Sequence, residues 1–247
     1  MWARTRAVAL VGAMGHVIDV QVDLSQGQIR TAVVGRPDAA VNEAIDRCRA
    51  AVDNSGFEWP TSRRITILLS PADLPKRGTH LDLAIAVAIL LAHRGLPPPP
   101  RSAFIGELAL DGTVRHVDGV LVAARWLKRR GYEQVFVPAA DAEEASLVEG
   151  LEVMPCADLA AVVRHVTGVE AIAPSIARPH DAGDRSGPVE HDLAEVHGQE
   201  EARRALEIAA AGGIKTFVGR ILPLREAAAA HRLVEANEVT GKVMLEP

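Results

Sequence analysis

The sequence predicts an α+β fold, and three observations lead to it. Residues 16–24 alternate apolar and polar side chains, which is typical of a strand with one buried face. Residues 37–56 place apolar side chains on one face at helical spacing. From Arg101 onward, strand-like and helical stretches follow one another, which favours a partly parallel sheet.

The N-terminal stretches predict an antiparallel start to a sheet. Residues 6–12 and 28–35 are strand-like and flank residues 16–24, and Ser-Gln-Gly at 25–27 is a turn signal. The first residues also resemble a signal peptide, because arginines precede a short apolar run. We favour a strand, since two glycines interrupt that run and strand-like alternation follows at once.

Residues 37–56 predict the first helix. Pro37 suits its first turn. Glu43 and Arg47 form an i,i+4 pair in the favourable order on the polar face. Cys48 lies on the apolar face, so we interpret it as a small core residue and not as a reactive thiol.

A strand, a loop and a second helix come next. Residues 63–70 are rich in branched side chains, and residues 71–78 predict the loop. Residues 79–95 predict a helix that is apolar nearly all round and should therefore be buried. Thr79 and Asp82 have the spacing of a capping box at its start.

The second half predicts a hairpin and then alternating elements. Residues 103–117 form the hairpin, which turns at Asp111-Gly112. The elements expected after it are helices at 118–131, 139–150 and 157–168 and strands at 133–138 and 151–155.

Composition narrows the classes of protein to which the chain can belong. The net charge of −5 exerts no general pull on nucleic acid, so such a contact needs a local basic patch. Cys48 and Cys156 cannot make a disulfide framework, and no Cys/His cluster suggests zinc. We therefore expect a reducing cytoplasm and no metal. Residues 83–92, the longest apolar stretch, are about half as long as a membrane span.

Three ordered stretches carry a family resemblance. They are VVGRPDAAVNEAIDRCRAAVDNSGFEWP, RRITILLSPADLPKRGTHLDLAIAVAIL and FIGELALDGTVRHVDGVL. Together they resemble the N-terminal part of the Mg-chelatase-like AAA+ ATPases of the ComM/YifB type, over residues 3 to 168. The resemblance implies a fold like the Lon protease proteolytic domain (ribosomal protein S-five domain 2-like), also present in the RadA recombination protein.

The resemblance continues past a linker and then stops. We assign residues 1–168 to the Lon-like domain and residues 169–190 to a linker rich in Pro, Gly and Ser. Residues 191–213 resemble the segment that opens the family's AAA+ module. The family's Gly-rich phosphate loop does not follow, because Ile214 precedes Lys215 and no Gly-x-x-x-x-Gly-Lys-Ser/Thr is present.

The last stretch resembles a different family. We assign residues 214–247 to a short α/β tail. Its final 30 or so residues are similar to the C-terminus of medium-chain zinc alcohol dehydrogenases and quinone oxidoreductases. A helix at 224–236 and a final strand are expected there. We interpret the chain as a fusion in which the AAA+ protein is truncated before its Walker A loop. No Gly-x-Gly-x-x-Gly supports a dinucleotide fold.

The Lon-like resemblance raises a Ser-Lys peptidase, but the residues do not support one. The family serine aligns with His80, and the positions of the family lysine fall on Leu121 and Ala123. Thr79 is a substitute nucleophile in one interpretation, and a helix cap in the interpretation that we favour. We therefore expect no catalytic and no nucleotide-binding residues.

Two surfaces are candidates for interaction. The first is the signature loop with Asp73, Lys76, Arg77, Thr79 and Asp82, which contacts a partner module or DNA in one interpretation. In the other, Asp82 only caps the helix and Lys76 is solvated.

The second surface is a basic cluster formed by Arg125, Lys128, Arg129 and Arg130 at a helix end. DNA phosphates are one interpretation of this cluster. We favour the other, in which the helix dipole stabilises these cations.

The resemblance implies a family of hexameric ATP-driven motors that use ATP and Mg and act in DNA branch migration during natural transformation. We expect this chain to keep a non-catalytic accessory domain, without a cofactor. Its partners would be DNA, bound weakly, and other AAA+ subunits, with no membrane contact and no oligomer without the AAA+ module. The alternative is a residual enzyme: a Lon-like peptidase, an ATPase or, least favoured, an oxidoreductase.

Overall fold

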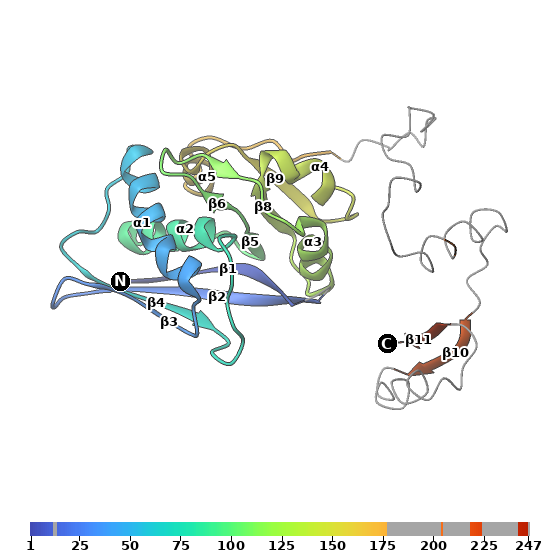
Figure 1. Ribbon diagram of the computed structural model, residues 1–247. Helices are drawn as coiled ribbons and strands as arrows, with labels where there is room; N and C mark the ends of the chain where they lie inside the picture. The colour runs from blue at the N-terminus through green and yellow to red at the C-terminus, as the bar shows by residue number, and fades with distance from the viewer. Residues whose placement is uncertain (12–13, 177–203, 205–217, 224–241, 247) are drawn as a thin grey trace. The chain divides into compact units, whose positions relative to one another are not determined.

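The computed structural model of the protein describes residues 1–11, 14–176, 204, 218–223 and 242–246 (Figure 1). Contacts divide the chain into two units, Met1–Pro179 and His180–Pro247, and each is described by itself. The described part of the first unit combines antiparallel and parallel sheets with helices, so the predicted α+β class is confirmed.

The largest sheet of the first unit has the strand order β1-β2-β4-β3. Its strands are β1 (Trp2–Val11), β2 (Met14–Ser25), β3 (Thr31–Val34) and β4 (Arg64–Ser70). The antiparallel β1–β2 pair was predicted. The prediction that β3 turns back on β2 is wrong, because β3 pairs with β4 in parallel and β4 pairs with β2. Every second residue of β4 is buried, which suits a central strand, whereas β3 has no buried residue and suits an edge.

Two helices lie against this sheet (Figure 1). They are α1 (Ala39–Asn54) and α2 (Asp82–Arg94). The side chain of Asp38 caps α1 by accepting from Val41 N at 2.9 Å, so Pro37 precedes the helix and does not occupy its first turn. Every residue of α2 from Asp82 to Ala92 is buried, as its all-round apolar pattern predicts.

A parallel sheet with the order β5-β8-β9 forms the second part of this unit. The elements here are β5 (Ser102–Phe104), α3 (Val120–Arg129), β8 (Gln134–Pro138), η1 (Ala139–Asp141), α4 (Ala142–Ala145), β9 (Glu152–Cys156) and α5 (Leu159–Val166). Alternate residues of the strands enter two cores. Phe104 and Phe136 belong to the core of α2 and α5, whereas Val135 and Val137 belong to the core of α3 and α4.

The predicted hairpin joins β6 (Glu107–Leu108) to β7 (Val114–Arg115). It turns at Asp111-Gly112 as the sequence indicates, with Gly112 N donating to the carbonyl of Ala109 at 3.0 Å. Gly112 has a φ of +89°, and a Cβ there would lie 2.2 Å from Ser55 Oγ at the end of α1. The backbone conformation therefore favours glycine, and any other residue would also displace the Ser55 side chain.

The expected linker begins as an ordered segment. Ile172 N donates to His165 Nδ1 at 2.9 Å, and Ser175 N donates to the carbonyl of Val153 in β9 at 2.7 Å. The rest of the linker, at 177–190, lies outside the described residues. The domain boundaries stay predictions.

In the second unit, β10 (Val218–Pro223) pairs in parallel with β11 (Lys242–Glu246). The strand expected at the end of the chain is confirmed by β11. The helix predicted at 224–236 falls outside the described residues, and so does the segment at 191–213 apart from Arg204. In the described parts of both units, no helix has the length and apolar character needed to cross a membrane.

Candidate functional site

The signature loop connects β4 to α2 and is fastened to the start of α1. Lys76 N donates to the carbonyl of Arg36 at 3.2 Å, and Asp38 N donates to the carbonyl of Lys76 at 3.0 Å. The Asp38 carboxylate also accepts from Gly78 N at 3.2 Å. The guanidinium of Arg36 donates to the carbonyl of Asp73 at 2.8 Å. These bonds hold the loop in one conformation on the body of the domain.

Lys76 is an interior residue of this loop, with 0% of its surface exposed. Its ammonium group donates to the carbonyl of Pro71. Burial lowers the pKa of Lys76. The interpretation of a solvated Lys76 is therefore wrong, and Lys76 does not present its side chain to a partner. Asp73 and Arg77 are the exposed charged residues of the loop.

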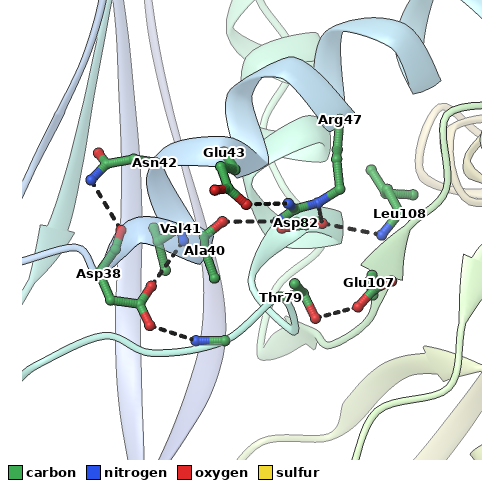
Figure 2. Close-up of polar contacts among 11 residues, drawn as sticks. Asp38, Ala40, Val41, Asn42, Glu43, Arg47, Thr79, Asp82, Glu107 and Leu108 are labelled. Carbon is green, nitrogen blue, oxygen red and sulfur yellow. Dashed lines mark hydrogen bonds and ion pairs between the residues drawn. The ribbon is translucent and has the colours of Figure 1, made fainter.

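Asp82 is also fully buried, and it forms an ion pair with Arg47 of α1 (Figure 2). Arg47 Nε lies 2.7 Å from Asp82 Oδ2, and a second guanidinium nitrogen lies 3.1 Å from Oδ1. The backbone N of Leu108 in β6 donates to Oδ2 at 3.3 Å. Burial raises the pKa of Asp82 to about 6, although the hydrogen bonds and charge of Arg47 oppose that rise.

Arg47 also connects the pair to the rest of α1. Its guanidinium donates to the carbonyl of Ala40 at 2.9 Å and lies 3.9 Å from the carboxylate of Glu43 (Figure 2). The predicted Glu43–Arg47 pair is therefore present, but Asp82 is the closer partner. The hydrogen bond to Asp82 raises the pKa of Arg47. One carboxylate thus joins α1, α2 and the β6 hairpin in the interior.

The predicted capping box at Thr79 and Asp82 is wrong. The N-cap of α2 is Leu81, without a side-chain cap, and Leu83 N donates to the carbonyl of Gly106 at 3.1 Å. The hydroxyl of Thr79 instead donates to the carboxylate of Glu107 in β6 (Figure 2). Neighbouring backbone carbonyls satisfy the helix start, which frees Thr79 for this contact. A hydroxyl beside a carboxylate is the arrangement of a nucleophile with its base.

The positions that align with the Lon dyad hold other side chains. His80 is half-buried, and its Nε2 is buried with no hydrogen-bond partner in the described part of the chain. Burial lowers the pKa of His80. Leu121 and Ala123 are apolar residues of α3, and Ala123 is buried in the second core.

The basic cluster occupies the C-terminal half of α3 and its end, and its members Arg125, Lys128, Arg129 and Arg130 are all exposed. Lys128 donates to the carbonyl of Gly150, and the guanidinium of Arg129 lies 5.7 Å from the centre of the Trp126 ring. The cluster is therefore accessible, and its contact with DNA stays a prediction.

The two cysteines are poorly suited to bind a metal. Both are buried, Cys48 in α1 and Cys156 in β9, and burial raises the pKa of each thiol. Over residues 1–11, 14–176 and the short described segments after them, no three His, Cys, Asp or Glu side chains lie together as a metal would need.

Comparison with known proteins identifies the first unit. Residues 20–141 match the family model of subunit ChlI of Mg-chelatase. The uncharacterized protein YifB of Escherichia coli is 39% identical over 83% of this chain and 40% of its own length. Competence protein ComM of Haemophilus influenzae is 38% identical over 83% of this chain and 40% of its own. The chain belongs to the Mg-chelatase-like family of ComM and YifB.

A shorter similarity leads to a DNA repair protein. RadA of Bacillus subtilis is 33% identical over 36% of this chain and 19% of its own length. Relatives of this Mg-chelatase-like chain therefore include proteins named for competence and for DNA repair. The chain spans about two fifths of the length of YifB and ComM.

Residues 108–245 match the model of a second family, zinc-binding dehydrogenase. The match includes the tail, so the dehydrogenase resemblance of the tail is confirmed, and over these residues the chain also belongs to that family. The match begins in the β6 hairpin and overlaps the Mg-chelatase match over residues 108–141. Zinc does not fit the described residues, because Cys48 and Cys156 are buried thiols without neighbouring ligands.

The sequence alone did not predict the contacts that two residues of this site make. Arg47 was expected to pair only with Glu43, and Glu107 was not singled out. Asp82 offered a signal, since a carboxylate at the start of a helix that is apolar all round needs a buried partner. No local pattern in the sequence indicates which cationic residue is the buried partner of Asp82.

Proposed function

We propose that residues 1–168 form a Lon-like accessory domain of a Mg-chelatase-like protein, with a binding role and no catalysis. The α+β architecture supports this proposal, with its antiparallel sheet, buried helix and parallel second sheet. The names of the relatives, competence protein ComM and DNA repair protein RadA, support a place in DNA processing.

The buried Asp82–Arg47 pair is the observation that carries the proposal. The most polar residues of the signature loop region are used to hold the domain together: Asp82 binds Arg47, and Lys76 binds a backbone carbonyl. A catalytic carboxylate or lysine must reach a substrate, whereas these two groups are inside. The exposed charges that remain, Asp73 and Arg77, suit contact with a partner module.

The basic cluster of α3 is the surface that we propose for contact with DNA. Each phosphate that a cation neutralises contributes a slope of about −0.9 to the dependence of log K on log salt. We expect weak binding of duplex DNA at low salt that collapses at physiological salt. The test is fluorescence anisotropy of a labelled duplex with the full chain across a salt series.

Lys128→Gln combined with Arg129→Gln should lower both the affinity and the salt slope. The matched control replaces two exposed arginines far along the sequence, Arg30 and Arg49, by glutamine. Binding that persists unchanged in high salt, or equal losses in both double variants, would contradict a role for the basic cluster.

We expect no ATP binding by this chain. A phosphate loop supplies several backbone amides and a lysine, and the 247 residues contain no such motif. Isothermal titration calorimetry with Mg-ATP should give no saturable heat in the micromolar range. Saturable binding would show that the chain retains a nucleotide site of another kind.

A residual hydrolase is the second candidate, and the Thr79–Glu107 contact favours it. Glu107 would take the hydroxyl proton while Thr79 Oγ1 attacks the carbonyl carbon of a peptide bond. That proton would then pass to the amine that leaves as the peptide bond breaks, and water would hydrolyse the resulting acyl ester. Turnover of fluorogenic casein that Thr79→Ala and Glu107→Gln both abolish would establish this activity and refute the non-catalytic proposal. We expect no turnover by the full chain.

A further inference from the structure

An open hollow of about 370 Å³ lies on the first unit, and no residue of the signature loop lines it. It is lined by Arg6, Arg101, Arg130, Gly131 and Tyr132. The three arginines come from separate parts of the fold: β1, the residue before β5, and the C-terminal end of α3. The tertiary structure therefore gathers cations that are distant in the sequence around one space.

Positive charge exceeds negative charge around this hollow. Arg6 Nε lies 3.2 Å from Asp19 Oδ1, and Arg101 lies 2.5 Å from the carboxylate of Glu133. Arg130 is exposed and has no ion pair with any residue that the structure describes. Guanidinium groups gathered around one space repel one another, and a bound anion would relieve that repulsion.

The geometry around the hollow is held by the backbone. The carbonyl of Arg101 accepts from Glu133 N at 2.9 Å and from Gln134 N at 3.2 Å, which ties Arg101 to the start of β8. Arg130 N donates to carbonyls of α3 at the end of that helix. Such anchoring lowers the cost of ordering the guanidinium groups when a ligand binds.

Tyr132 adds a hydroxyl to the lining. Its side chain is half-buried, and burial raises its pKa, while the neighbouring arginines Arg6, Arg4 and Arg130 oppose that rise. The phenol is therefore neutral at physiological pH and remains a hydrogen-bond donor.

We propose that this hollow binds a phosphate group. Guanidinium groups match phosphate oxygens with paired, charge-assisted hydrogen bonds, and a tyrosine hydroxyl completes such a set. The volume is within the range of small-ligand sites, so it suits a free pyrophosphate-sized ligand as well as a phosphate of a DNA strand. The hollow shares Arg130 with the basic cluster of α3, whereas Arg6, Arg101 and Tyr132 belong to the hollow alone.

The helix dipole explains only part of the arrangement. It favours a cation at the end of α3 and so accounts for Arg130. It does not account for Arg6, in a strand, or for Arg101, which precedes another strand. Arg6 and Arg101 each have one carboxylate partner, and a common anionic ligand would engage all three guanidinium groups at once.

The single tyrosine of the chain gives a direct assay. The full chain is labelled with 3-fluorotyrosine, so that its one ¹⁹F resonance reports on Tyr132. Pyrophosphate should shift this resonance saturably at constant ionic strength, whereas chloride should not. A shift that is linear in pyrophosphate, or that chloride reproduces, would overturn the proposal.

Matched arginine variants test whether the site is built. Arg130→Gln should weaken pyrophosphate binding by about tenfold, because charge-assisted hydrogen bonds are lost. Arg49→Gln, exposed on α1 and outside the hollow, should leave the affinity within about twofold. Equal weakening by both variants would show diffuse attraction to positive charge and would refute a defined site.

A second arm separates the two sources of phosphate. A single-stranded oligonucleotide that shifts the resonance and competes with pyrophosphate supports a strand phosphate as ligand. A shift with pyrophosphate and none with the oligonucleotide supports a free phosphate compound. No shift with either ligand overturns the proposal, whatever the basic cluster does in anisotropy.

Discussion

The Asp82–Arg47 pair predicts a specific dependence of stability on pH. Burial raises the pKa of Asp82 from 3.8 to about 6 in the folded protein. The folded state therefore holds a proton between these values that the unfolded state has released, so stability falls as pH rises through this window. One pKa unit corresponds to about 1.4 kcal/mol. The raised pKa of Asp82 therefore lowers the free energy of unfolding by about 3 kcal/mol between pH 4 and pH 7.

Asp82→Asn removes this ionisation and keeps the shape of the side chain. Urea unfolding of both proteins at several pH values from 4 to 7 measures the difference in free energy of unfolding. We expect the variant to gain about 3 kcal/mol relative to the wild type across this range. The comparison isolates Asp82, because other titrating groups are shared. Asp73→Asn, at an exposed site, is the matched control and should leave the two pH profiles parallel.

Arg47→Met tests the same pair from its other side. At pH 7 it leaves a buried carboxylate without its cation, which costs about 3–5 kcal/mol. At pH 5 the wild-type carboxyl is itself largely protonated, so the loss should be clearly smaller. A constant difference between wild type and Asp82→Asn from pH 4 to 7, or a pH-independent loss in Arg47→Met, would refute the assigned burial and pairing of Asp82.

Three further predictions concern stability elsewhere in the first unit. Gly35→Ala should lower the free energy of unfolding in urea by at least about 1–3 kcal/mol. The reason is that Gly35 has a φ of +111° and that a Cβ would lie 2.1 Å from a carbonyl of β4. Gly56→Ala, where a Cβ would meet open space, should lower it by less. Hydrogen bonding to Asp141 raises the pKa of His116, so this contact stabilises the fold at low pH and is lost as pH rises through the folded pKa. Asp141→Asn should lower that pKa in an NMR titration, and an unchanged value would contradict the contact. A chain ending at Pro179 should melt within about 3 °C of the full chain in calorimetry, and a fall of more than about 10 °C would show that later residues stabilise the first unit.

Local patterns were sufficient for many elements of the fold. The alternation of residues 16–24 predicted β2, and the all-round apolar pattern of residues 83–92 predicted the burial of α2. The Asp111-Gly112 turn predicted the β6–β7 hairpin. These features depend on backbone preference and side-chain period over a few residues, which the sequence displays directly.

Strand order was beyond the reach of such patterns. The turn at 25–27 predicted that β3 would pair with β2, but β4 occupies that position and β3 lies beyond it in parallel. Which strand is central depends on how much of each strand the helices can cover. That choice is a property of the whole packed unit, and the buried face of β4 decides it.

The sites show the same division. The sequence by itself determined that residues 71–82 and the end of α3 carry the conspicuous charges, and that the Lon dyad positions hold His80 and apolar side chains. Only the tertiary structure decided that Asp82 binds Arg47, 35 residues away, and that Lys76 is buried. It alone gathered Arg6, Arg101 and Arg130 around one hollow. Charge and period are local properties, whereas burial and the choice of an ionic partner arise when distant segments exclude water together.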